Sequence, residues 1–467
     1  MIRSIGIALI AALVAGSVAP SAAEPVPPPI QQLTRDIYQQ LVELNTTESV
    51  GDTFVAAKAM AARLIAAGLP PSDVQVFQSG PKRGDLVARL RGTGKRKPIL
   101  LVAHLDVVEA KREDWSTDPF KLVEKDGYLY GRGTTDDKYM AAAWVTSMIR
   151  WQREGYKPDR DLILVLETDE ELGDRNSLGI RWLIENHHDL IVAEYAINEG
   201  GELEVKDGKP FANGIQTAEK RAQSFWIAAR NPGGHSSQPR KDNAIYEIAD
   251  ALGRLAKYDF PVLLNDTTRG FFARMSAIEQ GQLAQDMKSL ISARPDPAAI
   301  ARLTALPPYN AQIRTTCVAT RLEGGHADNA LPQLARAMIN CRIVPGQTTT
   351  QVQRNLERVV DDPKLVITVV PRDPGSEPSA MNPELFAAVE KLTQKFWPGT
   401  PVVPTMTAGA TDGRFLRAAG IPTYGHSGMA TDIFDIRAHG KDERVSLQAM
   451  YAGGEYLYEL VKALSGG

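Results

Sequence analysis

The feature that most constrains this chain is an apolar run that leads directly into acidic residues. Leu162 to Gly173 reads LILVLETDEELG, so a strand pattern ends in a cluster of carboxylates. Glu170 and Glu171 are adjacent, so their side chains leave the backbone in different directions. One can bind a cation while the other transfers protons. The alternative is a solvated helix start, where carboxylates are favourable.

Two other apolar runs end in the same way, which favours the first interpretation. Ile99 to Asp106 reads ILLVAHLD, and Ile191 to Gly201 reads IVAEYAINEGG. In open α/β sheets, ligands bind beyond the carboxyl ends of the strands. Three strands that end in His, Asp and Glu therefore predict one convergent acidic site that can bind metal.

Strand and helix patterns alternate over most of the chain. Helical patterns at Tyr139–Glu154 and Ser177–Asn186 flank the strand pattern Leu162–Leu166. This alternation predicts an α/β fold with a mostly parallel central sheet that has helices on both faces. From about Ala218 the strands alternate between apolar and polar residues, which indicates an inserted α+β domain with a half-exposed sheet.

The α/β pattern resumes after Pro371, so the insertion interrupts one domain. Within the insertion, Tyr258 to Asn310 has a mixed pattern and no clear assignment. We expect four segments: a leader at residues 1–23, a first catalytic part at 24–217, the inserted domain at 218–371 and a second catalytic part at 372–467.

The first residues have the pattern of a secretory signal. Arg3 precedes the apolar run Ile5–Val18, and Ser21-Ala22-Ala23 supplies small residues for cleavage. The run is too short to span a bilayer comfortably. We therefore expect an exported protein, periplasmic or secreted, with no membrane attachment after the signal is removed. The net charge of −3 over 467 residues predicts no basic face for nucleic acid.

Cys317 and Cys341 are the only two cysteines, which excludes a disulfide-rich framework. They lie in strand patterns that could be neighbours in one sheet. An exported compartment would permit them to pair, and the sequence leaves both the paired and the free state open.

Single residues at several points could contribute to the acidic site. His104 and Asp106 are two positions apart, so on extended backbone they point to the same side, and one can bind metal while the other orients it. Asp136 lies where a glycine-containing turn meets a helix, and its alternative role is a plain N-cap. Glu199 is followed by two glycines that permit close approach. His439 precedes the last helix and could instead be an ordinary surface residue.

Taken in order, these motifs resemble the dinuclear zinc family that contains aminoacylase, carboxypeptidase G, carboxypeptidase S and succinyl-diaminopimelate desuccinylase. Each motif alone is weak evidence, but the ordered set extends over nearly the whole chain after the leader. The matching residues are His104-Leu-Asp106, Gly131-Arg-Gly133 with Asp136-Asp-Lys138, Glu170-Glu171, Glu199-Gly-Gly201, Gly233-Gly-His235-Ser-Ser237, and His439-Gly440 with Asp442-Glu443-Arg444.

The resemblance implies a zinc exopeptidase-like fold and two zinc ions per subunit, bridged by Asp136 and by a water or hydroxide. It assigns His104 and Glu199 to one ion, and Glu171 and His439 to the other. Such mixed carboxylate and imidazole ligands suit zinc, and cobalt or manganese would also fit them. Asp106 would orient His104 and fix its tautomer.

The chemistry of such a site follows from its charges. Two close cations lower the pKa of a shared water and polarise a substrate carbonyl. Glu170, which is next to a ligand but is not one, is then the candidate general base.

The resemblance also assigns roles to residues of the inserted domain, which would be a lid and dimerisation domain. His235 would reach the partner's active site in a homodimer and donate a hydrogen bond to the oxyanion. Asn329 and Arg342 would lie near the substrate carboxylate, which an arginine can bind bidentately. The alternatives are an exposed turn for His235 and a strand-edge salt bridge for Arg342.

These features predict an exported dinuclear zinc hydrolase that cleaves an amide or peptide bond next to a free carboxylate. Its substrate would be a small peptide, cleaved as by a peptidase, carboxypeptidase or dipeptidase. The first alternative is an aminoacylase that hydrolyses N-acyl amino acids. An esterase or lactamase would use the same metals, and a non-catalytic binding module is a more distant alternative.

Overall fold

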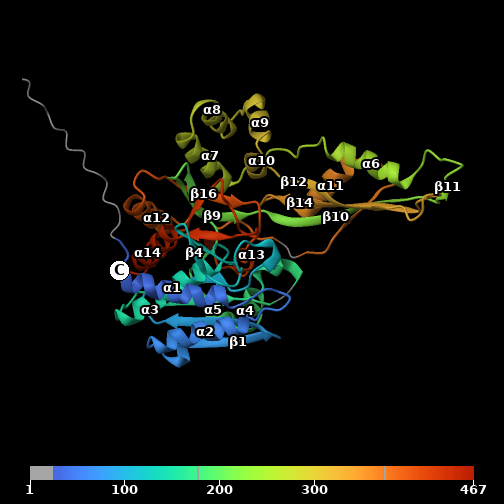
Figure 1. Cartoon of the computed structure of the whole chain (residues 1–467). Helices are drawn as coiled ribbons and strands as arrows, with labels where there is room; N and C mark the ends of the chain where they lie inside the picture. The colour runs from blue at the N-terminus through green and yellow to red at the C-terminus, as the bar shows by residue number, and fades with distance from the viewer. Residues whose placement is uncertain (1–24, 176–177, 373–374, 467) are drawn as a thin grey trace, which may run out of the picture.

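A ten-stranded sheet forms the centre of the computed structural model, which describes residues 25–175, 178–372 and 375–466 (Figure 1). The strand order is β1 (Val74–Gly80), β2 (Arg83–Leu90), β6 (Leu162–Glu167), β3 (Ile99–His104), β7 (Tyr195–Asn198), β17 (Thr423–Gly425), β9 (Lys209–Glu219), β8 (Leu203–Lys206) and β18 (Ala430–Asp432), and β16 (Val402–Thr407) pairs with β9. The central strands β6, β3 and β7 are parallel neighbours. The predicted α/β fold is confirmed.

Helices cover both faces of this sheet because its central strands are apolar on both sides. Alternate residues of β3 point to different cores, Leu101 to one face and Leu100 to the other. The first face is covered by α1 (Pro28–Glu43), α2 (Thr53–Ala66), α3 (Lys138–Arg153), α12 (Pro383–Phe396) and α14 (Leu447–Leu464). The second is covered by α4 (Ile180–Asn186), α5 (His188–Ile191) and α13 (Gly413–Ala418).

A second, antiparallel sheet extends away from the first (Figure 1). Its order is β12 (Thr316–Gly324), β14 (Leu334–Ile343), β10 (Arg221–Arg230) and β15 (Val366–Val369), and α6 (Ala244–Leu255) and α11 (Thr349–Val360) pack on one face. Along β14, buried residues alternate with partly exposed ones, as expected for a half-exposed sheet. At its far end, β11 (Gly234–His235) pairs with β13 (Ala330–Leu331).

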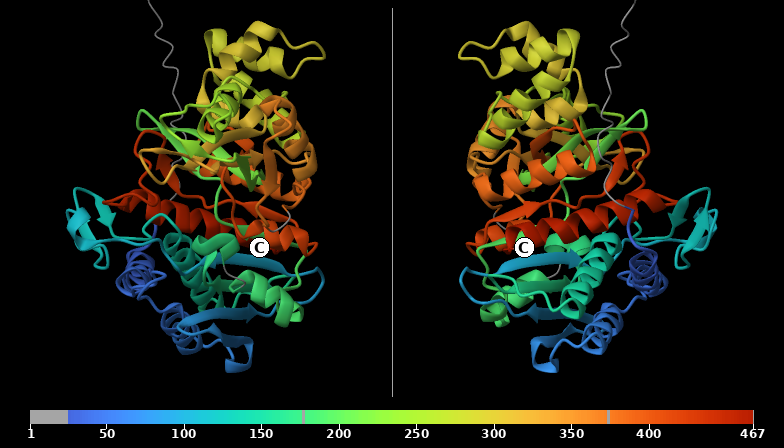
Figure 2. Two further views of the ribbon diagram at one scale, coloured as in Figure 1. Left: turned by 90° about the vertical axis from the view of Figure 1, so that its right-hand side faces the viewer. Right: turned by 90° about the vertical axis from the view of Figure 1, so that its left-hand side faces the viewer.

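The segment without a sequence assignment folds into helices that pack on the central sheet. These are α7 (Asp266–Ile278), α8 (Gly281–Leu290), α9 (Pro297–Thr304) and α10 (Pro307–Ile313). Phe272 and Met287 share a core with Val403 of β16. In Figure 2 the four helices (olive and yellow) lie at the end of the molecule opposite α2. This helical unit therefore belongs spatially with the central sheet, although it lies in sequence between two strands of the second sheet.

Cys317 and Cys341 form a disulfide that joins β12 to β14, where the two residues are direct cross-strand partners. Among the described residues, no helix is both long and apolar enough to cross a bilayer. The expected signal segment at residues 1–23 lies outside the part of the chain that the structure describes.

Candidate metal centre

The polar ends of three neighbouring strands meet at one edge of the central sheet. β3 ends at His104, β7 ends just before Glu199, and β6 is followed by a short 3-10 segment, η3 (Glu170–Arg175). Because β6, β3 and β7 are parallel and adjacent, their carboxyl ends lie side by side. The convergence that the sequence predicted therefore exists in the fold.

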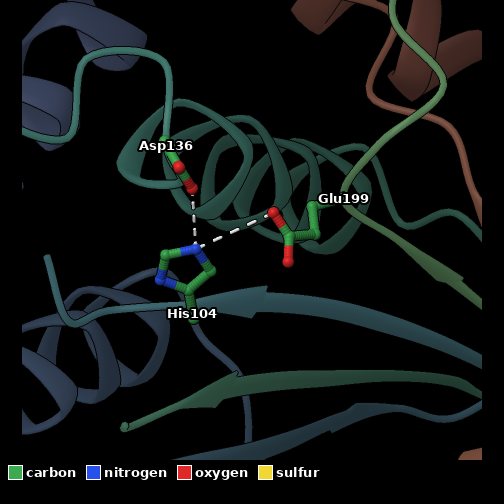
Figure 3. Close-up of side chains that lie close together, drawn as sticks. All are labelled: His104, Asp136 and Glu199. Carbon is green, nitrogen blue, oxygen red and sulfur yellow. Dashed lines mark hydrogen bonds and ion pairs between the residues drawn. The ribbon is translucent and has the colours of Figure 1, made fainter. Parts of the chain in front are cut away.

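Two groups of potential metal ligands meet here, and they share Asp136. In the first, His104 Nε2 lies 3.0 Å from Asp136 Oδ1 and 3.9 Å from Glu199 Oε2 (Figure 3). In the second, His439 Nε2 lies 3.0 Å from both Asp136 Oδ2 and Glu171 Oε1. The two oxygens of one carboxylate thus face two separate groups, which is an arrangement that could hold a pair of cations.

The electrostatics of the site also fit a cation. Burial and the nearby charge of Asp412 raise the pKa of Glu170. Burial and the nearby charge of Glu170 raise the pKa of Glu199. Burial also acts on Asp136, but hydrogen bonds with His104 and His439 lower its pKa overall. Several carboxylates thus lie close together in a largely buried site, where their mutual repulsion is costly. Bound cations would remove this cost, and carboxylates with imidazoles are suitable ligands for them.

Asp106 contacts His104 in a different way from the one expected. The Nδ1 of His104 lies 3.0 Å from the backbone oxygen of Asp106 but 3.6 Å from its carboxylate. The carboxylate instead accepts hydrogen bonds from the backbone N–H groups of Glu170, at 3.2 Å, and Glu171, at 3.0 Å. Asp106 therefore orients the imidazole mainly through its main chain and holds the Glu170–Glu171 turn through its side chain.

Glu443 was part of a recognised motif, but no role was predicted for it. Its fully buried carboxylate accepts hydrogen bonds from the loop that carries Asp136: the Gly133 N–H, the Thr135 N–H and hydroxyl, and the Asp136 N–H. It also pairs with the Arg132 guanidinium at 2.7 Å, and Arg132 donates to the carbonyl of Gly440. These bonds join the Asp136 loop to the loop that carries His439.

A small sheet supports this junction. It consists of β4 (Val123–Lys125), β5 (Tyr128–Tyr130) and β19 (Arg444–Ser446), and Tyr130 is the cross-strand partner of Arg444. The Asp136 loop starts directly after β5, and Glu443 directly precedes β19. Pairing of the two strands therefore brings together residues about 300 positions apart in sequence.

Two of the predicted residues lie elsewhere in this chain. His235 is exposed at the far end of the second sheet, where its Nδ1 is 2.8 Å from the hydroxyl of Ser237. Asn329 is beside it, since its carbonyl accepts a hydrogen bond from Ser236 N–H. Neither joins the two ligand groups of the same chain.

Arg342, by contrast, lines the cavity that contains the ligand groups. This cavity has a volume of about 1520 Å³, and its wall includes Asp136, Glu171, Glu199 and His439. Among the residues that the structure describes, Arg342 forms no ion pair, and the nearby charges that act on its guanidinium are those of Arg372 and Arg414. The Arg342 guanidinium is therefore a candidate to bind an anion that enters the cavity.

Comparison with known proteins agrees with the motifs. The model of peptidase family M20/M25/M40 matches residues 100–463. The N-fatty-acyl-amino acid synthase/hydrolase PM20D1 of Homo sapiens is 29% identical over 78% of this chain and 74% of its own length. A probable carboxypeptidase S-like protein of Dictyostelium discoideum is 28% identical over 78% of this chain and 71% of its own length.

A solved structure, the metallo-carboxypeptidase Sso-CP2 of Sulfolobus solfataricus, superposes with a TM-score of 0.68. It is 17% identical and covers 93% of this chain and 99% of its own. The family match confirms the resemblance and the expectation of a metal-dependent enzyme that hydrolyses amide or peptide bonds.

The role of Glu443 can be tested by the substitution Glu443→Gln. The variant keeps the shape of the side chain but removes the charge that pairs with buried Arg132. Breaking a buried ion pair typically costs about 3–5 kcal/mol. We expect a lower melting temperature and weaker metal binding, measured by thermal unfolding and by metal titration.

The matched control is Asp442→Asn, because Asp442 is adjacent and its side chain instead contacts Ser116. This variant should bind metal as the wild type does. If Glu443→Gln had wild-type stability and metal affinity, the proposed junction between the two loops would be wrong.

The pH dependence of metal binding should report on His439. In the metal-free protein, hydrogen bonds with Asp136 and Glu171 raise the pKa of His439 to about 10. The imidazole is therefore protonated at pH 7 and must lose its proton to bind a cation. We expect affinity to rise by up to about tenfold per pH unit from pH 7 to 9.

Calorimetry in buffers of different ionisation enthalpy would measure this proton release. In the His439→Gln variant, the number of protons released on metal binding should fall by the share that the His439 imidazole contributes in the wild type. Metal binding at pH 7 without proton release in the wild type would contradict the assignment.

Proposed function

Because the chain belongs to peptidase family M20/M25/M40, we propose that it hydrolyses an amide or peptide bond next to a free carboxylate. The observation that supports this most directly is the pair of ligand groups sharing Asp136, with Glu170 beside them. The whole arrangement faces a cavity that is large enough for a small substrate.

We propose two zinc ions per subunit, held by His104 and Glu199 on one side and by Glu171 and His439 on the other, with Asp136 between them. When bound, such ions polarise a carbonyl and make a water more acidic. Metal analysis of the purified protein checks both the stoichiometry and the choice of zinc over cobalt or manganese.

The chain itself supplies the proton transfer. The carboxylate of Glu170 would take a proton from the attacking water and return it to the leaving nitrogen. Asp106 positions this base, because its side chain holds the backbone N–H of Glu170. Arg342 would bind the substrate carboxylate, since a guanidinium can hold both carboxylate oxygens at once.

Two substrate classes have support. The human relative is named for N-fatty-acyl amino acids, which supports an N-acyl amino acid substrate. The carboxypeptidase S-like relative supports a short peptide with a free carboxyl end. Both classes place a carboxylate next to the bond that is broken, so both are compatible with the role of Arg342.

We also propose that the chain acts as a homodimer, in which the inserted domain at 218–371 contributes His235 to the partner's site. The support is geometric: His235 is exposed and is not among the ligand groups of its own chain. Finally, we propose export, with cleavage before Glu24. Sequencing the amino terminus of the mature protein checks this cleavage point.

Glu170→Gln should separate metal binding from catalysis. The variant lacks the group that accepts a proton, while every proposed ligand remains. We expect turnover to fall by about 10²- to 10⁴-fold, with metal content unchanged. Both are measured on the same preparation, by hydrolysis assay and metal analysis.

Glu171→Gln is the matched comparison, because the neighbouring carboxylate is a proposed ligand and its loss should reduce the metal content. Near-normal hydrolysis by Glu170→Gln would remove Glu170 from its role.

The dimer proposal predicts complementation between two inactive variants. In a hybrid of His235→Ala with Glu170→Gln, one site receives an intact base and an intact partner histidine. After random exchange of subunits, about half of the dimers are hybrids, and each hybrid has one of its two sites intact. About one quarter of wild-type activity should therefore be restored. No recovery after proven subunit exchange would show that His235 does not act across the dimer.

A further inference from the structure

A second, smaller cavity lies between α6 and the start of β12, apart from the metal ligands. Its volume is about 480 Å³, and its walls come from the end of α6, the segment after it, the connection between α10 and β12, and the first residues of β12. Among the described residues, none lines both this cavity and the larger one. None of the residues proposed to bind metal or substrate contributes to it.

Arg314 brings a buried cation with few partners into this smaller cavity. The residue is 5% exposed. Its Nη2 donates a hydrogen bond to the Thr304 hydroxyl at 2.8 Å, while Nη1 lies 3.7 Å from the Asp259 carboxylate, which is too far for a hydrogen bond. Within the described part of the chain, its buried Nε has no hydrogen-bond partner. A guanidinium has five N–H donors, so this one retains the capacity to bind a carboxylate.

Asp259 adds a negative charge to the wall of the same cavity. Its side chain is 61% exposed, and Arg314 is its only ion-pair partner among the residues that the structure describes. Burial lowers the pKa of Arg314, and the charge of Asp259 offsets this only in part. Asp259 would repel a ligand that carries only a negative charge, and Arg314 would repel one that carries only a positive charge. A ligand with both charges avoids both penalties.

The remaining wall of this cavity is mostly apolar. Leu252 and Leu255 line it from α6, and Tyr258 and Phe260 line it from the segment that follows. Leu255 and Phe260 are buried, and the rings of Tyr258 and Phe260 pack edge to face with their centres 5.1 Å apart. Sites for small molecules commonly combine such an apolar lining with a few polar groups that fix the orientation of the ligand.

Asn310 supplies a further polar group from α10. Its side-chain oxygen is buried and, in the described ranges of the chain, accepts no hydrogen bond. A buried acceptor without a donor is unfavourable. The ammonium group of a ligand is a suitable donor for this oxygen.

The segment that separates the two cavities contacts both of them. The Lys220 ammonium donates to the carbonyls of Ala311 and Arg314, each at 2.9 Å. Lys220 and Gln312 line the metal cavity, whereas Arg314 lines the smaller one. A ligand at Arg314 would therefore bind to the segment that also holds a wall residue of the metal cavity.

We propose that the smaller cavity is a binding site for a free α-amino acid with an apolar side chain. The ligand carboxylate pairs with Arg314, its ammonium group pairs with Asp259, and its side chain packs on the apolar wall. This site is separate from the metal ligands, so the inference goes beyond the proposed hydrolysis and does not depend on it. One product of that hydrolysis would be an amino acid, so this class of ligand would be present where the protein acts.

Calorimetric titration of the zinc-loaded full chain with L-phenylalanine tests the inference. Two analogues separate the charges: phenethylamine lacks the carboxylate, and 3-phenylpropionate lacks the ammonium group. Each analogue loses one charge-assisted contact, and such a contact typically contributes about tenfold or more to affinity. We therefore expect L-phenylalanine to bind at least about tenfold more tightly than either analogue.

Two variants locate the binding. Asp259→Asn should weaken L-phenylalanine binding about tenfold without weakening that of 3-phenylpropionate, because only the partner of the ammonium group is lost. Arg314→Gln should remove the binding of L-phenylalanine. Asp259 is exposed, so its variant still decides the question if the buried substitution at Arg314 prevents folding. The matched control is Asp250→Asn, an exposed acid of α6 that lines neither cavity, and it should bind as the wild type does.

The competing site for L-phenylalanine is the metal cavity, where Arg342 is proposed to bind a carboxylate. Arg342→Gln should retain binding at the smaller cavity. Three results would overturn the inference: no saturable binding at millimolar concentrations, equal affinity for L-phenylalanine and its analogues, or binding that is lost in Arg342→Gln but retained in Asp259→Asn. None of them bears on the proposed hydrolysis, which is measured separately by the activity of the wild type.

Discussion

The hydrogen bonds and the ion pair of the buried Glu443 carboxylate join the two loops of the candidate metal centre. Asp136 and His439 are about 300 residues apart in sequence, and neither lies in a central strand of the large sheet. The Glu443 carboxylate accepts a hydrogen bond from the backbone N–H of Asp136. It also pairs with Arg132, which donates to the carbonyl of Gly440, the residue after His439. Together with the pairing of β5 and β19, this bridge sets the distance between His439 and the proposed shared ligand Asp136. The proposed ligands at the strand ends, His104 and Glu199, supply only one of the two groups that share Asp136.

A second constraint is electrostatic. The fold brings four carboxylates, those of Asp136, Glu170, Glu171 and Glu199, to one place with two imidazoles. In the absence of a cation, burial and nearby carboxylates raise the pKa values of Glu170, Glu171 and Glu199, so their charged forms are disfavoured, and the two imidazoles compensate only part of the negative charge. The arrangement becomes favourable when positive charge is bound, so metal binding and the stability of this region should be coupled. Asp106 is a further carboxylate at this place, and its side chain holds the Glu170–Glu171 turn through two backbone N–H groups.

Much of the centre could be predicted from sequence because its geometry follows from local rules. Apolar runs that end in His104, Glu170 and Glu199 are recognisable, and parallel strands bring such ends together. The role of Glu443 could not be inferred in this way, because its partners come from a loop about 300 residues earlier and no periodicity reports such contacts. The only signal in the sequence was that Glu443 lies a few residues after His439-Gly440.

The helical unit α7–α10 was unpredictable for a related reason. Its helices are short, and what identifies them is their ends: Asn265 forms a capping box, Asp296 caps α9, and Pro307 begins α10. Their apolar residues are shared with β16, about 100 positions later. The packing of this unit on the central sheet, and so its place in the cavity wall, depends on tertiary contacts that helical patterns of 7 to 13 residues do not contain.

The disulfide between Cys317 and Cys341 has a practical consequence for anyone who produces this protein. It joins the edge strand β12 to β14 one residue before Arg342, an arginine in the wall of the cavity. A reducing cytosol keeps such thiols apart, whereas an oxidising expression host lets them combine. Recombinant batches from the two hosts can therefore differ in a covalent bond next to Arg342 in the cavity wall. Their thiol content should be determined before specific activities are compared.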